Sequence, residues 1–387
     1  MARDGKAAAT AMMRVRLVLA RWWPYVGSGR HSAVAAWGMS LLATAPMLLV
    51  YMLHYLVVPR GYHPTGFLQY DQPYYMANAQ AVASHGFSLT YGLPFSPFAD
   101  TPRIYFQPMA LILGLVLKLT RWDPGAIYVG FGIIAGIAMF RTALALCFAY
   151  VGRPRDLADW LASLAFLWGG GVVFLAGFAL FWFSGARWPA LWSASFALDP
   201  FDGYWFLNLG RNVYYATEAF YHVVFFAAVL LVIRGHYGRA AAAAALMSAS
   251  HPFTGLELLL VLGSFAALEL LVDRSVAPPP WFLLATLGLL LLHLSYYLVA
   301  LPRLSFESRQ VEQQWSLPWT LPLVSIAVAY GPVMLIGLAR LFHQGAWKAE
   351  LRRPEIRLAL VWFAVALLLA KHELFIAPRQ PLHFTRG

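Results

Sequence analysis

Charged residues are scarce in this sequence. Only 12% of its 387 residues are Asp, Glu, Lys or Arg, whereas 60% are hydrophobic. A water-soluble globule of this size needs a more polar surface than that composition supplies. The shortage of charge therefore excludes an ordinary soluble domain and predicts a protein whose solvent is the lipid bilayer.

Cysteine is almost absent, because Cys147 stands alone. A single cysteine cannot form a disulfide within the chain, and its apolar surroundings predict that it packs as a small hydrophobic residue. The sequence also lacks the Cys and His spacing of zinc and redox motifs. We find no internal repeat typical of solenoids or of transporters with inverted repeats.

Long apolar runs are what the sequence does contain. A helix needs roughly 20 apolar residues to cross about 30 Å of hydrocarbon. The runs are apolar on every face, which favours helices over the alternating strands of a barrel. We predict spans over residues 33–58, 124–151, 160–183, 213–233, 279–301, 319–342 and 356–372.

Two further segments complete the predicted bundle. Residues 106–120 are short for a span, and residues 239–272 are long for one but are interrupted where Pro252 follows His251. Proline disfavours helix just before it, so we expect two shorter helices there. The fold class is therefore an all-α integral membrane protein, a polytopic helical bundle of about 9 to 10 spans.

The formal net charge of +11 comes from basic residues at the ends of the predicted helices. This distribution predicts cytoplasmic loops by the positive-inside rule, and it argues against nucleic acid as a partner. The basic residues are Arg14, Arg16, Arg21 and Arg30 before the first span, Arg234 and Arg239 after a later one, and Lys348, Arg352, Arg353 and Arg357 in a late loop.

These charges set the predicted organisation. Residues 1–32 form a basic cytoplasmic or interfacial segment ahead of an uncleaved signal anchor, and residues 33–372 form the transmembrane bundle. Residues 373–387 form an external C-terminal segment, which belongs to either a short or a truncated chain. We expect a multi-pass protein of the plasma (inner) membrane with a cytoplasmic N-terminus and the lipid bilayer as its partner. If residues 106–120 span the membrane, Arg153 and Arg155 lie on the outer side. If that segment is re-entrant or interfacial, these two arginines are cytoplasmic, and the positive-inside rule favours this second arrangement.

The external loop 59–105 differs sharply from the rest of the chain. It combines aromatic residues with polar ones and with several prolines. The stretch from Pro73 to Ser84 has apolar and aromatic residues at helical spacing, so we predict a short amphipathic helix along the membrane surface that ends at Gly86.

This loop resembles the opening of the GT-C superfamily of polytopic membrane glycosyltransferases, which includes the protein O-mannosyltransferases and the aminoarabinose transferases. The resemblance is carried by Asp71 and Gln72, by Tyr74 and Tyr75 in the surface helix, and by the Pro-rich entry from Tyr105 to Pro108. Many members carry an Asp-Glu pair where this chain has Asp71 and Gln72. No metal ligand is therefore assigned, and a divalent metal stays an open possibility.

The resemblance implies transfer of a sugar from a polyprenyl-phosphate donor to an external acceptor, with inversion, in the cell envelope. Asp71 would be the catalytic base, because a positioned carboxylate can take the proton of an acceptor hydroxyl. Tyr74 and Tyr75 would contact the substrate. Arginine suits the departing phosphate, and the predicted external arginines are Arg211, Arg309 and Arg379. The other interpretation of Asp71 is a helix N-cap.

Ionisable residues within the apolar runs form a second set, because charge inside a bilayer is costly and faces the protein interior. Glu218 and His222 share a helical face as a hydrogen-bonded pair or an ion site. His251 is either a cavity residue or part of a tolerated helix break. The set is Arg141, Glu218, His222, His251 and Glu257. We expect Arg141 to pair with Glu218, Glu257 or Glu269.

Two other classes of protein fit the same sequence. Buried ionisable residues and broken helices also describe a transporter or channel. A non-catalytic membrane subunit of an envelope-assembly complex is the third alternative. A cavity opening to lipid beneath residues 59–105 favours the enzyme, whereas a polar path through the centre of the bundle favours the carrier.

Overall fold

The computed structural model describes residues 29–68, 71–84, 88–96, 102–168, 179–185, 208–213, 215–306, 309 and 347–372, with isolated positions between 323 and 342. This described part is built from helices, and its β pairing is limited to one isolated bridge between Tyr91 and Tyr105. The predicted all-α class is therefore confirmed.

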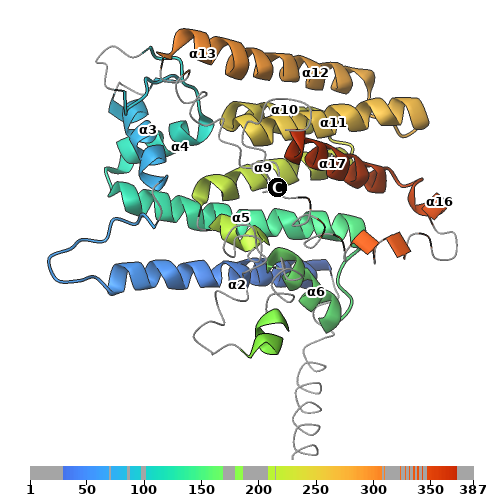
Figure 1. Ribbon diagram of the computed structural model, residues 1–387, viewed down its shortest axis with the longest axis horizontal. Coiled ribbons are helices and arrows are strands. Elements are labelled where there is room, and N and C mark those ends of the chain that lie inside the picture. Colours follow the sequence, from blue (N-terminus) through green and yellow to red (C-terminus); the bar gives the residue numbers. More distant parts are fainter. Residues whose placement is uncertain are drawn as a thin grey trace, which may run out of the picture.

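The longer helices run alongside one another in a bundle (Figure 1). In chain order the elements are α2 (Gly29–Leu56), α3 (Gln72–Ser84), α4 (Pro108–Thr120), α5 (Pro124–Val151), α6 (Leu157–Trp168), η3 (Asn208–Val213), α9 (Ala216–Ile233), α10 (Tyr237–Ser250), α11 (Pro252–Val272), α12 (Pro280–Leu294), η4 (Ser295–Ala300), α13 (Leu301–Leu304), α16 (Trp347–Glu350) and α17 (Pro354–Ala370).

Five helical stretches of the described part are long and apolar enough to cross a membrane: Ala33–Leu56, Pro124–Val151, Ala216–Ile233, Pro252–Val272 and Pro280–Leu304. Only 17% of the 18-residue window that qualifies the last stretch is buried inside the protein, as expected for a helix that faces lipid. The protein is therefore a polytopic α-helical membrane protein. Residues 169–178 of the predicted span 160–183 and most of the predicted span 319–342 lie outside the described residues, and α17 has 17 residues.

The break expected before Pro252 is present. α10 ends at Ser250, His251 adopts an extended backbone, and α11 begins at Pro252. The His251 ring caps the new helix, because its Nδ1 accepts a hydrogen bond from the Thr254 amide at 3.1 Å. α11 is nevertheless 21 residues long, so the break leaves a full membrane span after it.

The segment 106–120 forms α4, which packs against α3 and is too short to cross a bilayer. The helices touch closely because Gly114 faces the main chain of Ala79, whose carbonyl oxygen lies 2.7 Å from where a Cβ on Gly114 would stand. Figure 1 shows α3 and α4 together at one end of the bundle. This geometry agrees with the re-entrant alternative for this segment.

The bundle has two chemically different ends. The aromatic end carries the described parts of residues 59–107, which include α3, then α4, the starts of α5 and α9, the α10–α11 break and the end of α12 with α13. The basic end carries the close of α5 and α9 and the starts of α10, α12 and α17. There Tyr237 packs on Phe282 at 5.3 Å between ring centroids, and Arg353 donates to the Tyr150 carbonyl at 3.2 Å.

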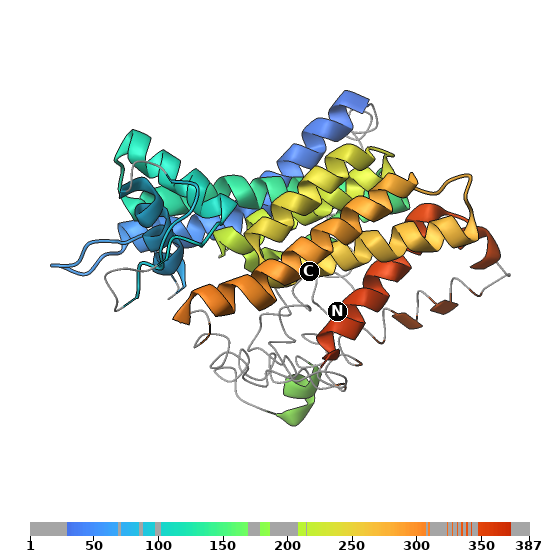
Figure 2. The ribbon, with the colours of Figure 1, turned by 90° about the horizontal axis from the view of Figure 1, so that it is seen from above.

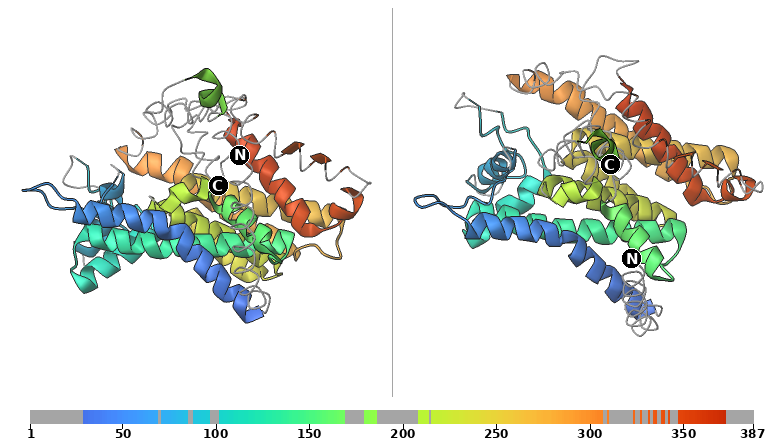
Figure 3. Two further views of the ribbon diagram at one scale, coloured as in Figure 1. Left: turned by 90° about the horizontal axis from the view of Figure 1, so that it is seen from below. Right: turned by 60° about the horizontal axis from the view of Figure 1, so that its bottom comes forward.

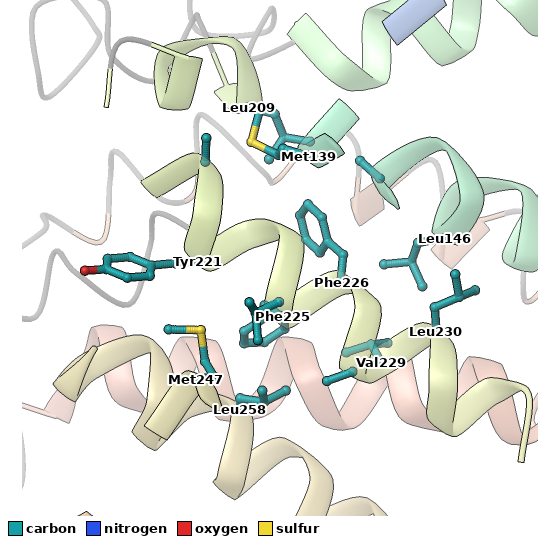
Figure 4. Packing of buried hydrophobic residues seen from close by; sticks show 14 of the residues in the cluster. Met139, Leu146, Leu209, Tyr221, Phe225, Phe226, Val229, Leu230, Met247 and Leu258 are labelled. Atoms are coloured by element: carbon teal, nitrogen blue, oxygen red, sulfur yellow. The ribbon is translucent and has the colours of Figure 1, made fainter. Parts of the chain in front are cut away.

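The apolar core is centred on α9, as the close view in Figure 4 shows. Phe225, Phe226 and Val229 of this helix lie between residues of α5 and residues of α10 and α11. Gly132 and Gly136 face Ala216 and Val213, whose side-chain carbons are 3.2 Å from the position of an added Cβ. Small residues therefore allow close approach, as is common between helices in lipid. Figures 2 and 3 show α2 and α17 on different sides of this core.

A buried ion pair joins α17 to α11. Arg357 donates through Nε and Nη2 to the two carboxylate oxygens of Glu269, and the residues are 8% and 0% exposed. Glu269 was one of the acids expected to pair with Arg141, and that expectation is wrong for Glu269. The reason is geometric, because Arg141 lies on α5 while α17 presents Arg357 directly to Glu269.

We expect Arg357→Met to lower the stability of the protein by about 3–5 kcal/mol, because it leaves the Glu269 carboxylate buried without a cation. The double variant Glu269→Leu/Arg357→Met should recover most of the loss, since it removes both charges. Thermal unfolding in detergent micelles measures both. A double variant no more stable than Arg357→Met would contradict the ion-pair assignment.

Gly114→Ala should separate α3 from α4 and destabilise the protein by about 1–3 kcal/mol, because the added Cβ meets main-chain atoms that cannot move aside. Gly130→Ala is the matched control, since it also lies within a helix and has nothing within 4 Å of its added Cβ. We expect the control to be neutral or stabilising by about 1 kcal/mol. Equal unfolding temperatures for the two variants would refute the close contact.

Candidate functional site

Asp71 stands immediately before α3, at the aromatic end. Its carbonyl oxygen accepts a hydrogen bond from the Tyr74 amide at 3.1 Å, as expected where a helix begins. The predicted surface helix is present as Gln72–Ser84, but one of its faces is buried against α4 through Met76, Ala79 and Val82. This packing fixes the position of Asp71 relative to the bundle.

Gln72, which stands where the resembled family often has a second acid, has a structural role here. It is fully buried, and its Oε1 accepts the Leu68 amide at 2.7 Å. The side chain therefore holds the residues before α3 against this helix. A second acid stands on a different helix at the same end of the bundle.

That second carboxylate is Glu218 in the first turn of α9. Both Glu218 and Asp71 lie close enough to Tyr75 for their charges to act on its hydroxyl, and Tyr75 also hydrogen-bonds with Thr217. Burial first, and then the charge of Glu218, raise the pKa of Tyr75 well above its ordinary value. Tyr75 therefore stays neutral, and its hydrogen bond with Thr217 holds α3 against the first turn of α9, which carries Glu218. Asp71 and Tyr75, selected by the resemblance, thus lie at the same end of the bundle as Glu218, selected as an ionisable residue in an apolar run.

His222 lies one helical turn beyond Glu218 and is 3% exposed. Its Nδ1 is 2.7 Å from the main-chain carbonyl oxygen of Glu218 and 3.3 Å from the Asn212 amide nitrogen. These contacts support the structural alternative for this histidine. Within the described residues no group of three His, Cys, Asp or Glu side chains is arranged to hold a metal ion.

His251 joins the same end of the bundle through Tyr221. The two rings lie 4.6 Å apart between centroids, and the Tyr221 hydroxyl accepts a hydrogen bond from Gln107 Nε2 at 3.1 Å. Gln107 is the residue just before α4. The helix break therefore places the His251 imidazole against Tyr221, which in turn binds Gln107 at the start of α4.

Tyr296 anchors residues 104–106, which lead into α4. It lies in η4, a π-helical turn that interrupts the regular helix after α12, and such turns are frequent at functional sites. Its hydroxyl donates to the Ile104 carbonyl at 2.9 Å and accepts from the Phe106 amide at 3.3 Å. Tyr105 and Ser305 share a hydrogen bond at 2.8 Å.

The sequence analysis did not select Gln107, Tyr221, Tyr296 or Ser305. The available signal was the pair of adjacent tyrosines at 296 and 297 within an otherwise apolar run, because a tyrosine in lipid needs a partner for its hydroxyl. Nothing in the sequence indicated that the partner is main chain almost two hundred residues earlier.

Tyr91 and Tyr74 complete the aromatic cluster. Tyr91 is 5% exposed and pairs with Tyr105 through the isolated bridge, and burial raises its pKa above the ordinary value. Tyr74 is 41% exposed and stacks on Phe95 at 5.4 Å between ring centroids. The end of the bundle beside Asp71 is therefore a mainly neutral, aromatic surface.

The exposed cations in the described part of the aromatic end include Arg103, Arg303 and Arg309. Arg309 is exposed, its amide bonds the Ser305 carbonyl at 3.2 Å and its Nε bonds the Pro302 carbonyl at 3.1 Å. Arg103 is exposed next to Ile104. The side chain of Arg211 and the whole of Arg379 lie outside the described residues.

Arg141 and Glu257 do not belong to this cluster. Arg141 has its guanidinium carbon 5.7 Å from the centroid of the Trp37 ring and forms no ion pair with a described residue. Glu257 is 1% exposed and accepts a hydrogen bond from Trp362 Nε1 at 3.2 Å. The expected pairing of these two residues is therefore wrong, because each faces a different aromatic partner.

The fold and this cluster define a polytopic helical membrane protein with an acidic and aromatic site at one end of its bundle. No protein-family model matches the sequence, and no curated protein or solved structure matches the chain.

We expect Tyr296→Phe to loosen residues 102–107, because it removes two hydrogen bonds to their main chain. Amide exchange at Phe106 should become about 5- to 10-fold faster, which corresponds to about 1 kcal/mol. Tyr297→Phe is the matched control, since its hydroxyl has no hydrogen-bond partner among the described residues. Hydrogen-exchange mass spectrometry makes the comparison, and equal acceleration in both variants would contradict the anchor.

Proposed function

We propose that this chain is a membrane glycosyltransferase that moves a sugar from a polyprenyl-phosphate donor to an external acceptor by inverting displacement. The observation that carries the proposal is the hydrogen bond between Tyr75 and Thr217, which brings α3, with Asp71 just before it, to the first turn of α9, with Glu218. A lipid-linked donor reaches such a place from the bilayer, and an aqueous acceptor reaches it from the outer side.

In this proposal Asp71 is the base that takes the proton of the acceptor hydroxyl while the oxygen attacks the anomeric carbon. Glu218 supplies the second acid that position 72 lacks, and the neutral Tyr75 hydroxyl between them donates or accepts a hydrogen bond with the substrate. Tyr74 and Phe95 offer a flat surface beside the base. The leaving phosphate carries negative charge, which Arg309 and Arg103 are placed to offset.

A transporter is the second candidate, and Glu257 is the observation that favours it. A carboxyl group enclosed within a membrane span is often part of an ion or proton path. Around it, however, the described core consists of apolar side chains of α9, α11 and α17, and polar residues gather instead at the aromatic end. The distribution of polar residues therefore supports the transferase over the carrier.

Asp71→Asn should lower sugar transfer by about 10²- to 10⁴-fold, because an amide cannot accept the proton while it keeps the shape of the side chain. The measurement is transfer from radiolabelled polyprenyl-phosphate sugars by purified protein, with and without EDTA to show any need for a divalent metal. Full activity of Asp71→Asn would refute the base.

Asp123→Asn is the matched control. Asp123 is also an aspartate before a helix at the aromatic end, and its carboxylate caps α5 by accepting from the Ala126 amide at 2.9 Å. Asparagine caps equally well, so we expect unchanged transfer. Glu257→Gln keeps an acceptor for Trp362 and should also leave transfer unchanged, whereas an ion carrier would depend on it.

A further inference from the structure

Arg141 is a cation on a predicted membrane span without an acidic partner. It stands on α5, which has 28 residues, about 15 Å along the helix from Val151 at about 1.5 Å per residue. Its Nε is buried and has no hydrogen-bond partner among the described residues. A charge left in this condition is costly in a bilayer, so some anion is needed beside it.

The protein itself does not supply that anion within the described residues. The acids at the basic end already have other partners: Glu269 binds Arg357, Glu350 and Glu355 bind Arg353, Asp159 accepts the Arg155 amide, Asp156 accepts the Asp159 amide, and Asp273 accepts from Ser275. None of these acids forms an ion pair with Arg141, and Arg234 at the end of α9 is a second cation in this part of the bundle. Two positive groups therefore share this region.

Exposed apolar side chains lie beside Arg141. Trp37 lies over the guanidinium and is 50% exposed, and on the same face of α2 Val34 and Leu41 are 70% and 51% exposed. Their spacing forms an apolar stripe along the helix. Trp37 lies near the start of the candidate span Ala33–Leu56, where tryptophan commonly marks the boundary between hydrocarbon and headgroups.

We propose that Arg141 and Trp37 bind one anionic phospholipid, with its phosphate on the guanidinium and an acyl chain along Val34 and Leu41. A guanidinium binds phosphate with paired donors, and the exposed Arg234 adds positive charge that favours an anionic headgroup over a zwitterionic one. The site lies toward the basic end of the bundle, away from Asp71. It is therefore independent of the proposed transfer reaction.

Native mass spectrometry of the full chain in detergent tests this assignment. Dioleoyl phosphatidylglycerol and dioleoyl phosphatidylcholine are titrated separately, and one phosphatidylglycerol should be retained at concentrations about tenfold lower than phosphatidylcholine. Arg141→Met should lose that preference by about tenfold or more. Arg153→Met is the matched control, because Arg153 is exposed just beyond the end of the same helix, and it should bind as the wild type does.

Trp37→Leu gives a second variant that keeps the cation, and it should weaken retention of phosphatidylglycerol several-fold. A parallel titration with inorganic phosphate in place of lipid shows whether the site binds a free phosphate ion or the headgroup of a phospholipid. Equal retention by Arg141→Met and wild type would overturn the proposal, as would equal losses in Arg141→Met and Arg153→Met. Full displacement of the lipid by millimolar phosphate would also overturn it, because the acyl chain would then contribute nothing.

Discussion

A polar group inside this bundle has no water to bond with, and that constraint explains much of how the helices are arranged. Some of these groups bond the main chain of their own helix, as Ser40 does with Ala36, and others join two separate elements. Arg357 and Glu269 join α17 to α11, and Trp362 donates to Glu257 between the same two helices. The contacts that fix helix order are therefore few and polar, while the apolar core around α9 supplies the bulk of the packing.

The α10–α11 break follows the same logic. Interrupting a helix in an apolar setting frees main-chain groups, and here side chains bind them: His251 caps α11, and His293 of α12 lies 2.8 Å from the Pro252 carbonyl oxygen and 2.9 Å from the Ser248 hydroxyl. Gly255 permits this junction, because a Cβ there would lie 2.8 Å from the Cα of Ser248. These hydrogen bonds offset the free energy lost where the helix is interrupted, and the break places the His251 imidazole at the aromatic end.

The aromatic end is then assembled from segments that are distant in the chain. α3 brings Asp71 and Tyr75, α9 brings Glu218 and Tyr221, and η4 brings Tyr296. Burial keeps Tyr75 and Tyr91 neutral, so the acids carry the charge of this cluster. The cation of Arg141, by contrast, lies among exposed apolar side chains toward the basic end.

The sequence by itself determined the membrane class, the helical type and several helix bounds, because long apolar runs and proline act locally. The span 124–151 and the break at His251 follow directly from residue type. It also selected Asp71, Glu218 and His251 as chemically notable. Which of these residues meet was decided by tertiary structure alone. The pairing of Glu269 with Arg357, the anchoring of Ile104 by Tyr296 and the isolation of Arg141 depend on contacts between remote helices, and spacing along the chain carries no information about such contacts.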